Sequence, residues 1–348
     1  MKKIISGYFF RSIRSAELWI FTALVIIISF FGIGSPTLIT EEALGRDYQL
    51  TMTVEEAYEL SEDFNADIDG DIDTKIKTLI TDEIIVLIIP AIMIPLFIVL
   101  FMGRTFTGGA IRNLISSGHS KASVYLSSFI FGSLIAVAFN ILSLLSMSAA
   151  ILVYQWKYPI FFPLLCTYAL YMCLVDIVLV SVSLAVLFVS KRPVVSLIAV
   201  AGVIVLLFTG SAGVTMSMLL IPERYLSAAA VKEYRDEHPE SDIDMDWTLD
   251  IENFQDVYTF TDHGEPLDGS QFMGPKQKGH IDGTPRKILI TGLYSNPACG
   301  ALMSLFQITS RYRMWKDGFY AFFCLIDILW ISVINAVGLI VFRRQEIN

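Results

Sequence analysis

An acidic run early in the chain has the spacing of a calcium-binding loop. In N-A-D-I-D-G-D, oxygen ligands recur at every second position: Asn65, Asp67, Asp69 and Asp71. This spacing, with glycine at the sixth position, matches the first half of an EF-hand loop. The twelfth position of such a loop should hold a bidentate Glu, and here it holds Ile76. An acidic, solvated turn is therefore the favoured interpretation, and a calcium site is the alternative.

A second group of polar residues lies inside long apolar runs: Asp176, Asp327, Asn140 and Asn335. Asp176 lies near the middle of its run, roughly 20 Å of helix from either end at about 1.5 Å per residue. A carboxylate within a bilayer is costly, so it usually faces a cavity or a partner. A hydrogen bond to Ser181, to Ser183 or to a neighbouring helix is the favoured interpretation. A wet translocation path lined by these four residues is the alternative.

Sequence patterns for catalysis are absent. The four histidines have no metal-ligand spacing with another His or Cys, and neither H-E-x-x-H nor G-x-S-x-G occurs. The phosphate-binding pattern G-x-x-x-x-G-K-[ST] is also missing. We therefore expect no enzyme activity, no cofactor bound by this chain and no nucleic-acid partner. The four cysteines predict no disulfide framework: Cys166, Cys173, Cys299 and Cys324.

The composition is that of a membrane protein. Hydrophobic residues make up 54% of the chain and charged residues 17%, and the mean hydropathy is +0.61. A helix needs roughly 20 apolar residues to cross a hydrocarbon core. Six stretches meet this requirement: 18–38, 84–103, 124–154, 161–189, 194–221 and 318–342. The sequence thus predicts an all-α polytopic membrane protein with six transmembrane helices.

The distribution of Lys and Arg predicts the orientation of these spans. Eleven basic residues flank the spans on one side, against the two acids Glu17 and Glu346: Lys2, Lys3, Arg11, Arg14, Arg104, Arg112, Lys121, Lys191, Arg192, Arg343 and Arg344. Loops rich in Lys and Arg stay in the cytoplasm. We therefore expect both termini and segment 104–121 on the cytoplasmic side of a bacterial plasma membrane.

Two insertions on the other side are acidic. Segment 39–82 has 13 acidic and 3 basic residues, net −10, and segment 222–317 has 16 and 10, net −6. Attraction of cationic partners is one interpretation, and simple solubility is the favoured one.

In the second insertion, D-V-Y-T-F-T-D and R-K-I-L-I-T-G predict strands, residues 264–285 a loop, and 295–310 a helix. The expected division is 1–38, 39–82, 83–221, 222–317 and 318–348.

The first residues predict a helix in the membrane interface. Within residues 4–15, Ile and aromatic residues alternate with Arg in a pattern that suits a helix lying along the inner surface of the bilayer. No small-residue cleavage site follows the first apolar run, so we expect the segment to be retained.

Residues 104–121, R-T-F-T-G-G-A-I-R-N-L-I-S-S-G-H-S-K, have an amphipathic pattern of their own. Five apolar residues recur with the spacing of one helical face: Phe106, Ala110, Ile111, Leu114 and Ile115. Thr107 is expected to cap the start of a helix over 106–117, and Gly118 to stop it. A small helix displayed at the membrane surface is typical of a docking element for a second protein.

Four features together resemble the membrane subunit of type-2 ABC exporters, the ABC-2 permease family. They are the basic start M-K-K-I-I-S-G-Y-F-F-R-S-I-R-S before Trp19, six spans with both ends inside, the run from Phe106 to Leu126, and Ser295-Asn296-Pro297 before a last span that ends in Phe342-Arg343-Arg344. The resemblance covers roughly 1–38, 83–221 and 288–348. Both acidic insertions depart from the smaller family members.

This resemblance implies that 106–117 is a coupling helix that rests in a groove of a separate ATPase, which binds ATP and Mg. The implied coupling residues are Phe106, Gly109, Ile111, Arg112, Asn113, Leu114, His119 and Lys121. Arg112, Asn113 and His119 would face the ATPase, whereas Ile111, Leu114 and Ile115 would pack on the membrane domain. A second permease copy is also implied, as a homodimer or a heterodimer. A plain basic loop is the alternative.

The resemblance leaves the cargo open. The acidic exterior and the 12% aromatic content favour export of cationic amphipathic peptides, such as a toxin, a bacteriocin or an antimicrobial peptide, or immunity to them. Drugs, ions and lipid-linked cargo are alternatives within the family. A transporter driven by an ion gradient and a membrane sensor are alternatives outside it.

Overall fold

The computed structural model describes residues 1–31, 71–153, 162–211, 223–241, 243–250, 255–263, 265–276, 281, 283–298 and 319–345. The candidate calcium ligands Asn65, Asp67 and Asp69 lie outside these ranges, as does Cys299. Asp71 is the first residue of a helix. Of the predicted helix 295–310, only the first four residues are described.

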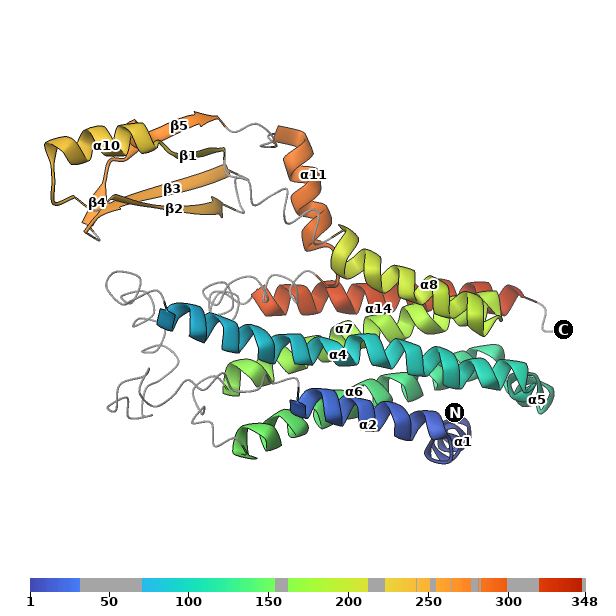
Figure 1. Cartoon of the computed structure of the whole chain (residues 1–348). Coiled ribbons are helices and arrows are strands. Elements are labelled where there is room, and N and C mark those ends of the chain that lie inside the picture. The colour runs from blue at the N-terminus through green and yellow to red at the C-terminus, as the bar shows by residue number, and fades with distance from the viewer. Residues whose placement is uncertain are drawn as a thin grey trace.

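Long helices form a bundle (Figure 1). They are α1 (Lys2–Ile13), α2 (Ala16–Phe31), α4 (Asp71–Thr107), α6 (Lys121–Val153), α7 (Phe162–Ser190), α8 (Pro193–Val205) with the π-helical turn η1 (Leu206–Ser211), and α14 (Phe319–Arg344). The short helix α5 (Ala110–Ser116) connects α4 to α6. Within the described ranges, five helices are long and apolar enough to cross a membrane, or up to six when α1 and α2, which meet at a 71° bend, count as one span.

The observed helices differ from the predicted spans mainly at their ends. Helices α6, α7 and α14 lie close to the predicted 124–154, 161–189 and 318–342. Helix α4 begins at Asp71, well before the predicted start at 84. Its first turns follow the sequence D-I-D-T-K-I-K-T-L-I-T-D, in which Ile and Leu recur three and four residues apart. Such a pattern continues a helix beyond the apolar run, so the segment expected over 39–82 has a helical end.

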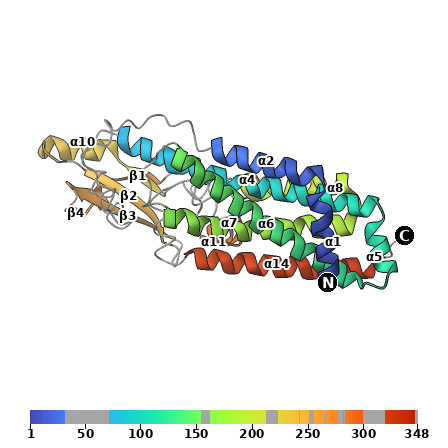
Figure 2. The ribbon, with the colours of Figure 1, turned by 90° about the horizontal axis from the view of Figure 1, so that it is seen from below.

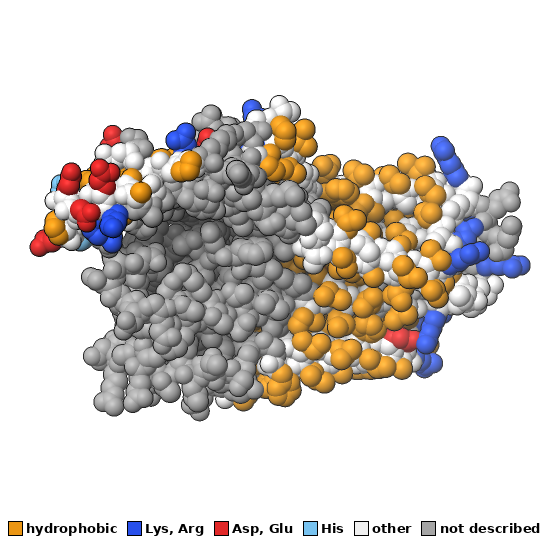
Figure 3. All heavy atoms as spheres, turned by 45° about the horizontal axis from the view of Figure 1, so that its top comes forward, with side chains coloured by type: hydrophobic (Ala, Val, Ile, Leu, Met, Phe, Trp, Pro, Cys, Tyr) orange, Lys and Arg blue, Asp and Glu red, His pale blue; other side chains and the backbone are white. Residues whose placement is uncertain are grey.

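The surface of the bundle has three zones (Figure 3). A broad belt of apolar side chains lies between an end with many Lys and Arg side chains and the region near the acidic residues of α10 (Ala228–Glu237). In the apolar window of α14 only 17% of residues are buried, against 61% in that of α7. Exposed leucine, isoleucine and valine over this area fit contact with lipid. The zone with Lys and Arg, which also holds both termini and α5, is called the basic end below (Figures 1 and 2).

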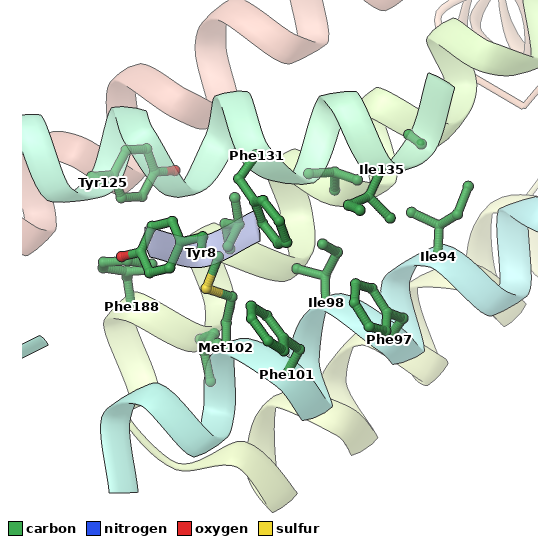
Figure 4. Packing of buried hydrophobic residues seen from close by; sticks show 14 of the residues in the cluster. Tyr8, Ile94, Phe97, Ile98, Phe101, Met102, Tyr125, Phe131, Ile135 and Phe188 are labelled. Carbon is green, nitrogen blue, oxygen red and sulfur yellow. The ribbon is translucent and has the colours of Figure 1, made fainter. Parts of the chain in front are cut away.

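Aromatic rings form a column through the core of the bundle, among aliphatic side chains such as Ile94, Ile98 and Ile135 (Figure 4). Phe131 of α6 lies against Phe9 of α1, with ring centroids 5.1 Å apart, and against Phe101 of α4 at 5.3 Å. Phe101 in turn stacks on Phe97 at 5.5 Å. Phe131, Phe97 and Phe101 are 0%, 0% and 5% exposed. The column therefore joins α1 to α4 and α6, the two helices that flank α5.

An α/β lobe lies between η1 and α14 in the sequence, and in space it lies near the end of the bundle opposite the basic end (Figure 1). It contains β1 (Arg224–Leu226), α10, β2 (Ile243–Asp250), β3 (Gln255–Asp262), β4 (Glu265–Leu267), the turn η2 (Ser270–Phe272), β5 (Met273–Lys276) and α11 (Gly283–Tyr294). The strands form two antiparallel sheets, β1-β5 and β2-β3-β4. A small core of Ile243, Phe260 and Phe272 packs against α10.

The sequence predictions for the lobe were right at one strand and wrong at the other strand and at the loop. The strand predicted from D-V-Y-T-F-T-D is confirmed as β3. The strand predicted from R-K-I-L-I-T-G is wrong, because residues 286–292 belong to helix α11. Arg286, Ile290 and Leu293 are buried at helical spacing, and a short apolar run does not distinguish helix from strand. The loop predicted over 264–285 is also wrong, since β4, η2 and β5 lie in it.

The close packing of α6 against α7 and α4 at Gly132 can be tested by its effect on stability. A Cβ on Gly132 of α6 would lie 2.6 Å from Val180 Cγ1 of α7 and 3.3 Å from Ile98 Cδ1 of α4. We expect Gly132→Ala to lower the free energy of unfolding by about 1–3 kcal/mol, because the helices must separate. Gly202→Ala is the matched control: it has open space around it in α8 and should be neutral or stabilising by ~0.5–1 kcal/mol. Thermal unfolding of the purified variants measures both, and equal melting temperatures would contradict the packing.

Candidate functional site

Helix α5 is set off from α4 by a turn at Gly109. Gly109 has φ +69°, in the left-handed region, and its carbonyl accepts from the Asn113 N–H at 2.9 Å to begin the helix. The predicted cap at Thr107 is wrong. Thr107 still belongs to α4, and its hydroxyl donates to the carbonyl of Gly103 at 3.3 Å. The helix is shorter than the predicted 106–117 because this turn intervenes.

The end of α5 matches the prediction. Gly118 has φ +92°. Its N–H donates to the carbonyl of Ile115 at 3.0 Å, and the His119 N–H donates to the carbonyl of Leu114 at 3.2 Å. These two bonds form a Schellman motif, which satisfies carbonyls at a helix end and needs a residue that tolerates positive φ. Glycines at both ends therefore hold α5 as a separate element.

The two faces of α5 have different surroundings. Ile111 is 2% exposed and belongs to the bundle core, and Leu114 and Ile115 pack against that core. Phe106, at the end of α4, contacts Phe188 of α7 with ring centroids 4.9 Å apart. Arg112 and Asn113 are exposed, whereas Gly109 and His119 are partly buried. The apolar face thus rests on the bundle, and the opposite face presents a cation and an amide.

Lys121 has partners that the sequence did not indicate. Its Nζ donates to the backbone carbonyls of Arg343, at 3.2 Å, and of Gln345. The side chain of Gln345 donates in turn to the carbonyl of Val189 at 3.1 Å. The end of α14 is thereby bound to the start of α6 and to the end of α7. Lys121 lies beside α5, but its ammonium group binds carbonyls at the carboxyl-terminal end of α14. A cation is stabilising at that end of a helix.

An ion pair links the start of α2, just after the bend from α1, to the end of α4. Glu17, in the first turn of α2, pairs with Arg104 of α4. The Glu17 side chain is 12% exposed and that of Arg104 is 72% exposed. Because such a pair is largely screened by water, it contributes only ~0–1 kcal/mol. The pair instead holds the start of α2 against the last turns of α4, because Arg104 lies one turn before the end of α4.

Asp176 is bonded to a neighbouring helix. The amide Nδ2 of Asn140, on α6, donates to Asp176 Oδ2 on α7 at 2.5 Å and also approaches the carbonyl of Ala136 at 3.0 Å. Asp176 is fully buried and Asn140 is 5% exposed. The alternative partners proposed from the sequence were wrong. Ser181 and Ser183 donate to carbonyls of their own helix, at 2.8 and 2.7 Å.

Asp327 and Asn335 lie in a different seam, between α14 and α7. Asn335 Nδ2 donates to Ser181 Oγ at 2.9 Å. The other contacts of this seam are Phe323 with Tyr171 and Phe342 with Phe188. Asp327 is fully buried, and neither of its carboxyl oxygens has a hydrogen-bond partner within the described ranges.

The four intramembrane polar residues therefore form two sites. Asp176 is five residues from both Tyr171 and Ser181, which contact α14. At ~100° per residue it points about 140° away from each of them. Asp176 thus faces α6, whereas Asp327 lies on the α14 face that packs on the other side of α7. Of the four candidate translocation residues, the structure brings Asn140 and Asp176 together, whereas Asp327 and Asn335 lie eight residues apart on α14.

The S-N-P turn before the last span joins the lobe to three parts of the bundle. The carbonyl of Ser295 accepts from Trp330 Nε1 of α14 at 2.7 Å. Asn296 Nδ2 donates to the carbonyl of Leu207 in η1 at 3.0 Å. The carbonyl of Pro297 accepts from the Tyr171 hydroxyl of α7 at 2.9 Å. The sequence analysis singled out this turn as a family feature, but it did not indicate these partners.

Within the part of the chain that the structure describes, no group of three or more His, Cys, Asp or Glu side chains could hold a metal ion. Three cysteines in that part are free: Cys166, Cys173 and Cys324. No family model matches the chain, and no curated protein or solved structure matches it either.

The Asn140–Asp176 bond can be tested by removing one or both partners. We expect Asp176→Asn to keep the melting temperature near that of the wild type, because an amide oxygen still accepts from Asn140. Asp176→Leu should lower the free energy of unfolding by about 1–3 kcal/mol, since it deprives a buried amide of its acceptor. The double variant Asn140→Leu/Asp176→Leu should recover much of the loss. A single Leu variant as stable as the wild type would exclude a structural bond.

Proposed function

We propose that this chain is the membrane subunit of an ATP-driven exporter of the ABC-2 kind, which couples to a separate ATPase through α5. In this proposal six helices cross a bacterial plasma membrane, with α1 in the interface and both termini in the cytoplasm. The α/β lobe and the segment before α4 are extracellular. A second permease copy completes the transporter, and ATP and Mg bind the partner ATPase.

The observation that carries the proposal is the construction of α5. A connector between two spans needs only a few residues, yet this one is a helix bounded by two left-handed glycines, Gly109 and Gly118. Its apolar face is held by the core through Ile111, so a force on its exposed face reaches α4 and α6. Arg112 and Asn113 on that face supply directional hydrogen-bond donors that suit a protein groove.

The basic end supports the same orientation. Exposed cations from several different elements gather there: Arg104, Arg112, Arg192, Arg343 and Arg344. Loops of this composition stay on the cytoplasmic side during insertion. ATP is available on that side, and the chain has no phosphate-binding loop of its own. An energy source in another chain follows naturally from this arrangement.

The ion-gradient alternative fits the buried carboxyl groups less well. Such transporters gather charged residues into one ion site near the middle of the membrane. Asp176 and Asp327 lie on different sides of α7, and Asp176 is engaged with Asn140. Within the described ranges, neither seam gathers three or more acidic, His or Cys side chains.

Charge reversal on α5 tests the docking proposal. The tagged full chain, purified from its native host, should retain an ATPase with the pattern G-x-x-x-x-G-K-[ST], identified by mass spectrometry. We expect Arg112→Glu to reduce the retained ATPase by about ten-fold, the effect of losing ~1.4 kcal/mol of contact energy. Arg192→Glu, at an exposed cation of the same end, is the matched control and should retain it. Melting temperatures of both variants verify folding.

Two outcomes would contradict docking through α5. One is an ATPase that co-purifies equally with Arg112→Glu and with the wild type. The other is that no ATPase with this pattern co-purifies with the wild-type chain, whereas a kinase does, which would favour the sensor alternative.

For the cargo, we propose cationic amphipathic peptides, either exported as toxins or antimicrobial peptides or removed as an immunity function. The support is the charge of the chain outside the membrane, where both polar segments are acidic, net −10 over 39–82 and net −6 over 222–317. Such a charge attracts cations over about a Debye length, ~8 Å in physiological salt.

Peptide-stimulated ATP hydrolysis tests the cargo. In liposomes that contain the complete complex, we expect a cationic amphipathic helix to raise the hydrolysis rate several-fold, because bound cargo favours the catalytic conformation of the ATPase. A peptide of the same composition, scrambled to remove the apolar face, is the control. Indifference to both peptides, in a complex that hydrolyses ATP, would reject peptide cargo and leave coupling through α5 intact.

A further inference from the structure

Helix α1 has one face that packs on the bundle. Ile4, Tyr8 and Ser12 are buried at four-residue spacing. The Tyr8 ring lies 5.7 Å from that of Phe131, and its hydroxyl accepts from Ser128 Oγ at 3.2 Å. This face fixes the rotation of α1 on α6. The rest of its surface is therefore presented in a defined orientation.

The remaining surface of α1 carries exposed cations next to exposed apolar side chains. At ~100° per residue, Phe10 and Ile13 lie opposite the buried face. Arg11, Arg14 and Lys3 lie along one side of that face, and Lys2 lies beside Ile13 on the other side. Phe10 and Ile13 are each 56% exposed, and the four cations are exposed as well. No acidic residue precedes Glu17 in the sequence, so nothing on α1 neutralises this charge.

The position of α1 matches the depth of lipid headgroups. The helix lies across the basic end of the bundle, at 71° to α2 (Figure 2). Beside the bend is Trp19, 59% exposed, whose Nε1 donates to the carbonyl of Ile13 at 2.8 Å. Exposed tryptophan at this position is typical of the boundary between acyl chains and headgroups. The guanidinium of Arg14 lies 4.0 Å from the centroid of the Phe10 ring.

We propose that α1 binds anionic phospholipid headgroups through Lys3, Arg11 and Arg14 while Phe10 and Ile13 enter the acyl-chain region. Charge complementarity selects this occupant: three cations without an acid face the layer in which lipid phosphates lie. An apolar flank directly beside them is what a basic helix in a membrane interface requires. The proposal depends on the membrane location of the chain and not on its transport function.

Native mass spectrometry of the purified full chain tests the site. Phosphatidylglycerol and phosphatidylcholine are titrated separately, and the ratio of bound lipid gives the headgroup preference. We expect the wild type to prefer phosphatidylglycerol. Lys3→Gln/Arg11→Gln/Arg14→Gln should lose this preference by about five-fold for each cation removed, because one Lys or Arg near an anionic surface contributes that much. Folding is not at risk, since Ile4 and Tyr8 hold α1 in place.

A matched control removes the same charge from the same end. Arg192, Arg343 and Arg344 are exposed and lie outside α1. Their triple change to Gln should leave the preference for phosphatidylglycerol unchanged. Excess inorganic phosphate should not displace the lipid, because the acyl chains contribute to binding through Phe10 and Ile13.

Three results would overturn the proposal. The first is an α1 variant that keeps the full preference. The second is an equal loss in both triple variants, which would mean a diffuse attraction to the basic end. The third is displacement by inorganic phosphate, which would mean a site for the free anion.

Discussion

The packing of α7 against α4, α6, α8 and α14 is the constraint on which the rest of the bundle depends. In lipid there is little hydrophobic driving force for helices to associate. Close van der Waals packing and interhelical hydrogen bonds must therefore hold them together. Gly132 lets α6 approach α7, and Gly338 of α14 lies where a Cβ would meet Tyr125 and Ala185. Asn140–Asp176 and Asn335–Ser181 add one polar link on each side of α7. Small residues and polar pairs thus act together at the same interfaces.

Fixing α4 and α6 on α7 determines what their connector can be. The two helices end close together at the basic end, and a loose loop would be enough to join them. The chain instead makes two left-handed turns, at Gly109 and Gly118, and places a helix with a buried Ile111 between them. Residues other than glycine rarely adopt such turns. A connector with this much internal structure responds as a unit when its exposed face is pushed.

Much of the bundle could be predicted from the sequence because its signals are local. Long, predominantly apolar runs specify most of the bundle helices, and the apolar spacing in 104–121 specifies the face of α5. The lobe is different, because short runs such as R-K-I-L-I-T-G fit a helix or a strand, and their neighbours decide. Thr107 was misjudged for a similar reason, since α4 continues through it.

The polar contacts of the site could not be predicted from the sequence, for another reason. Asn140 and Asp176 are 36 residues apart in the chain, and Lys121 reaches carbonyls more than 220 residues away. Each residue was recognisable as unusual, but nothing local specifies its partner. Helix rotation decides it: one more residue in α7 would have turned Asp176 towards another helix. Prediction from one sequence therefore finds candidate residues better than it finds pairs.

The shared contacts of α1 and α4 connect the two proposals physically. Phe131 contacts Phe9 of α1 and Phe101 of α4, so a shift of either helix at this point must also displace the Phe131 ring. Glu17, directly after the bend, pairs with Arg104, one turn before α4 ends. A headgroup that holds α1 in the interface therefore also restrains the part of α4 that leads into α5. In the two proposals taken together, the bilayer is the fixed support against which the proposed ATPase moves α5, because a coupling element transmits force only when one side of it is anchored.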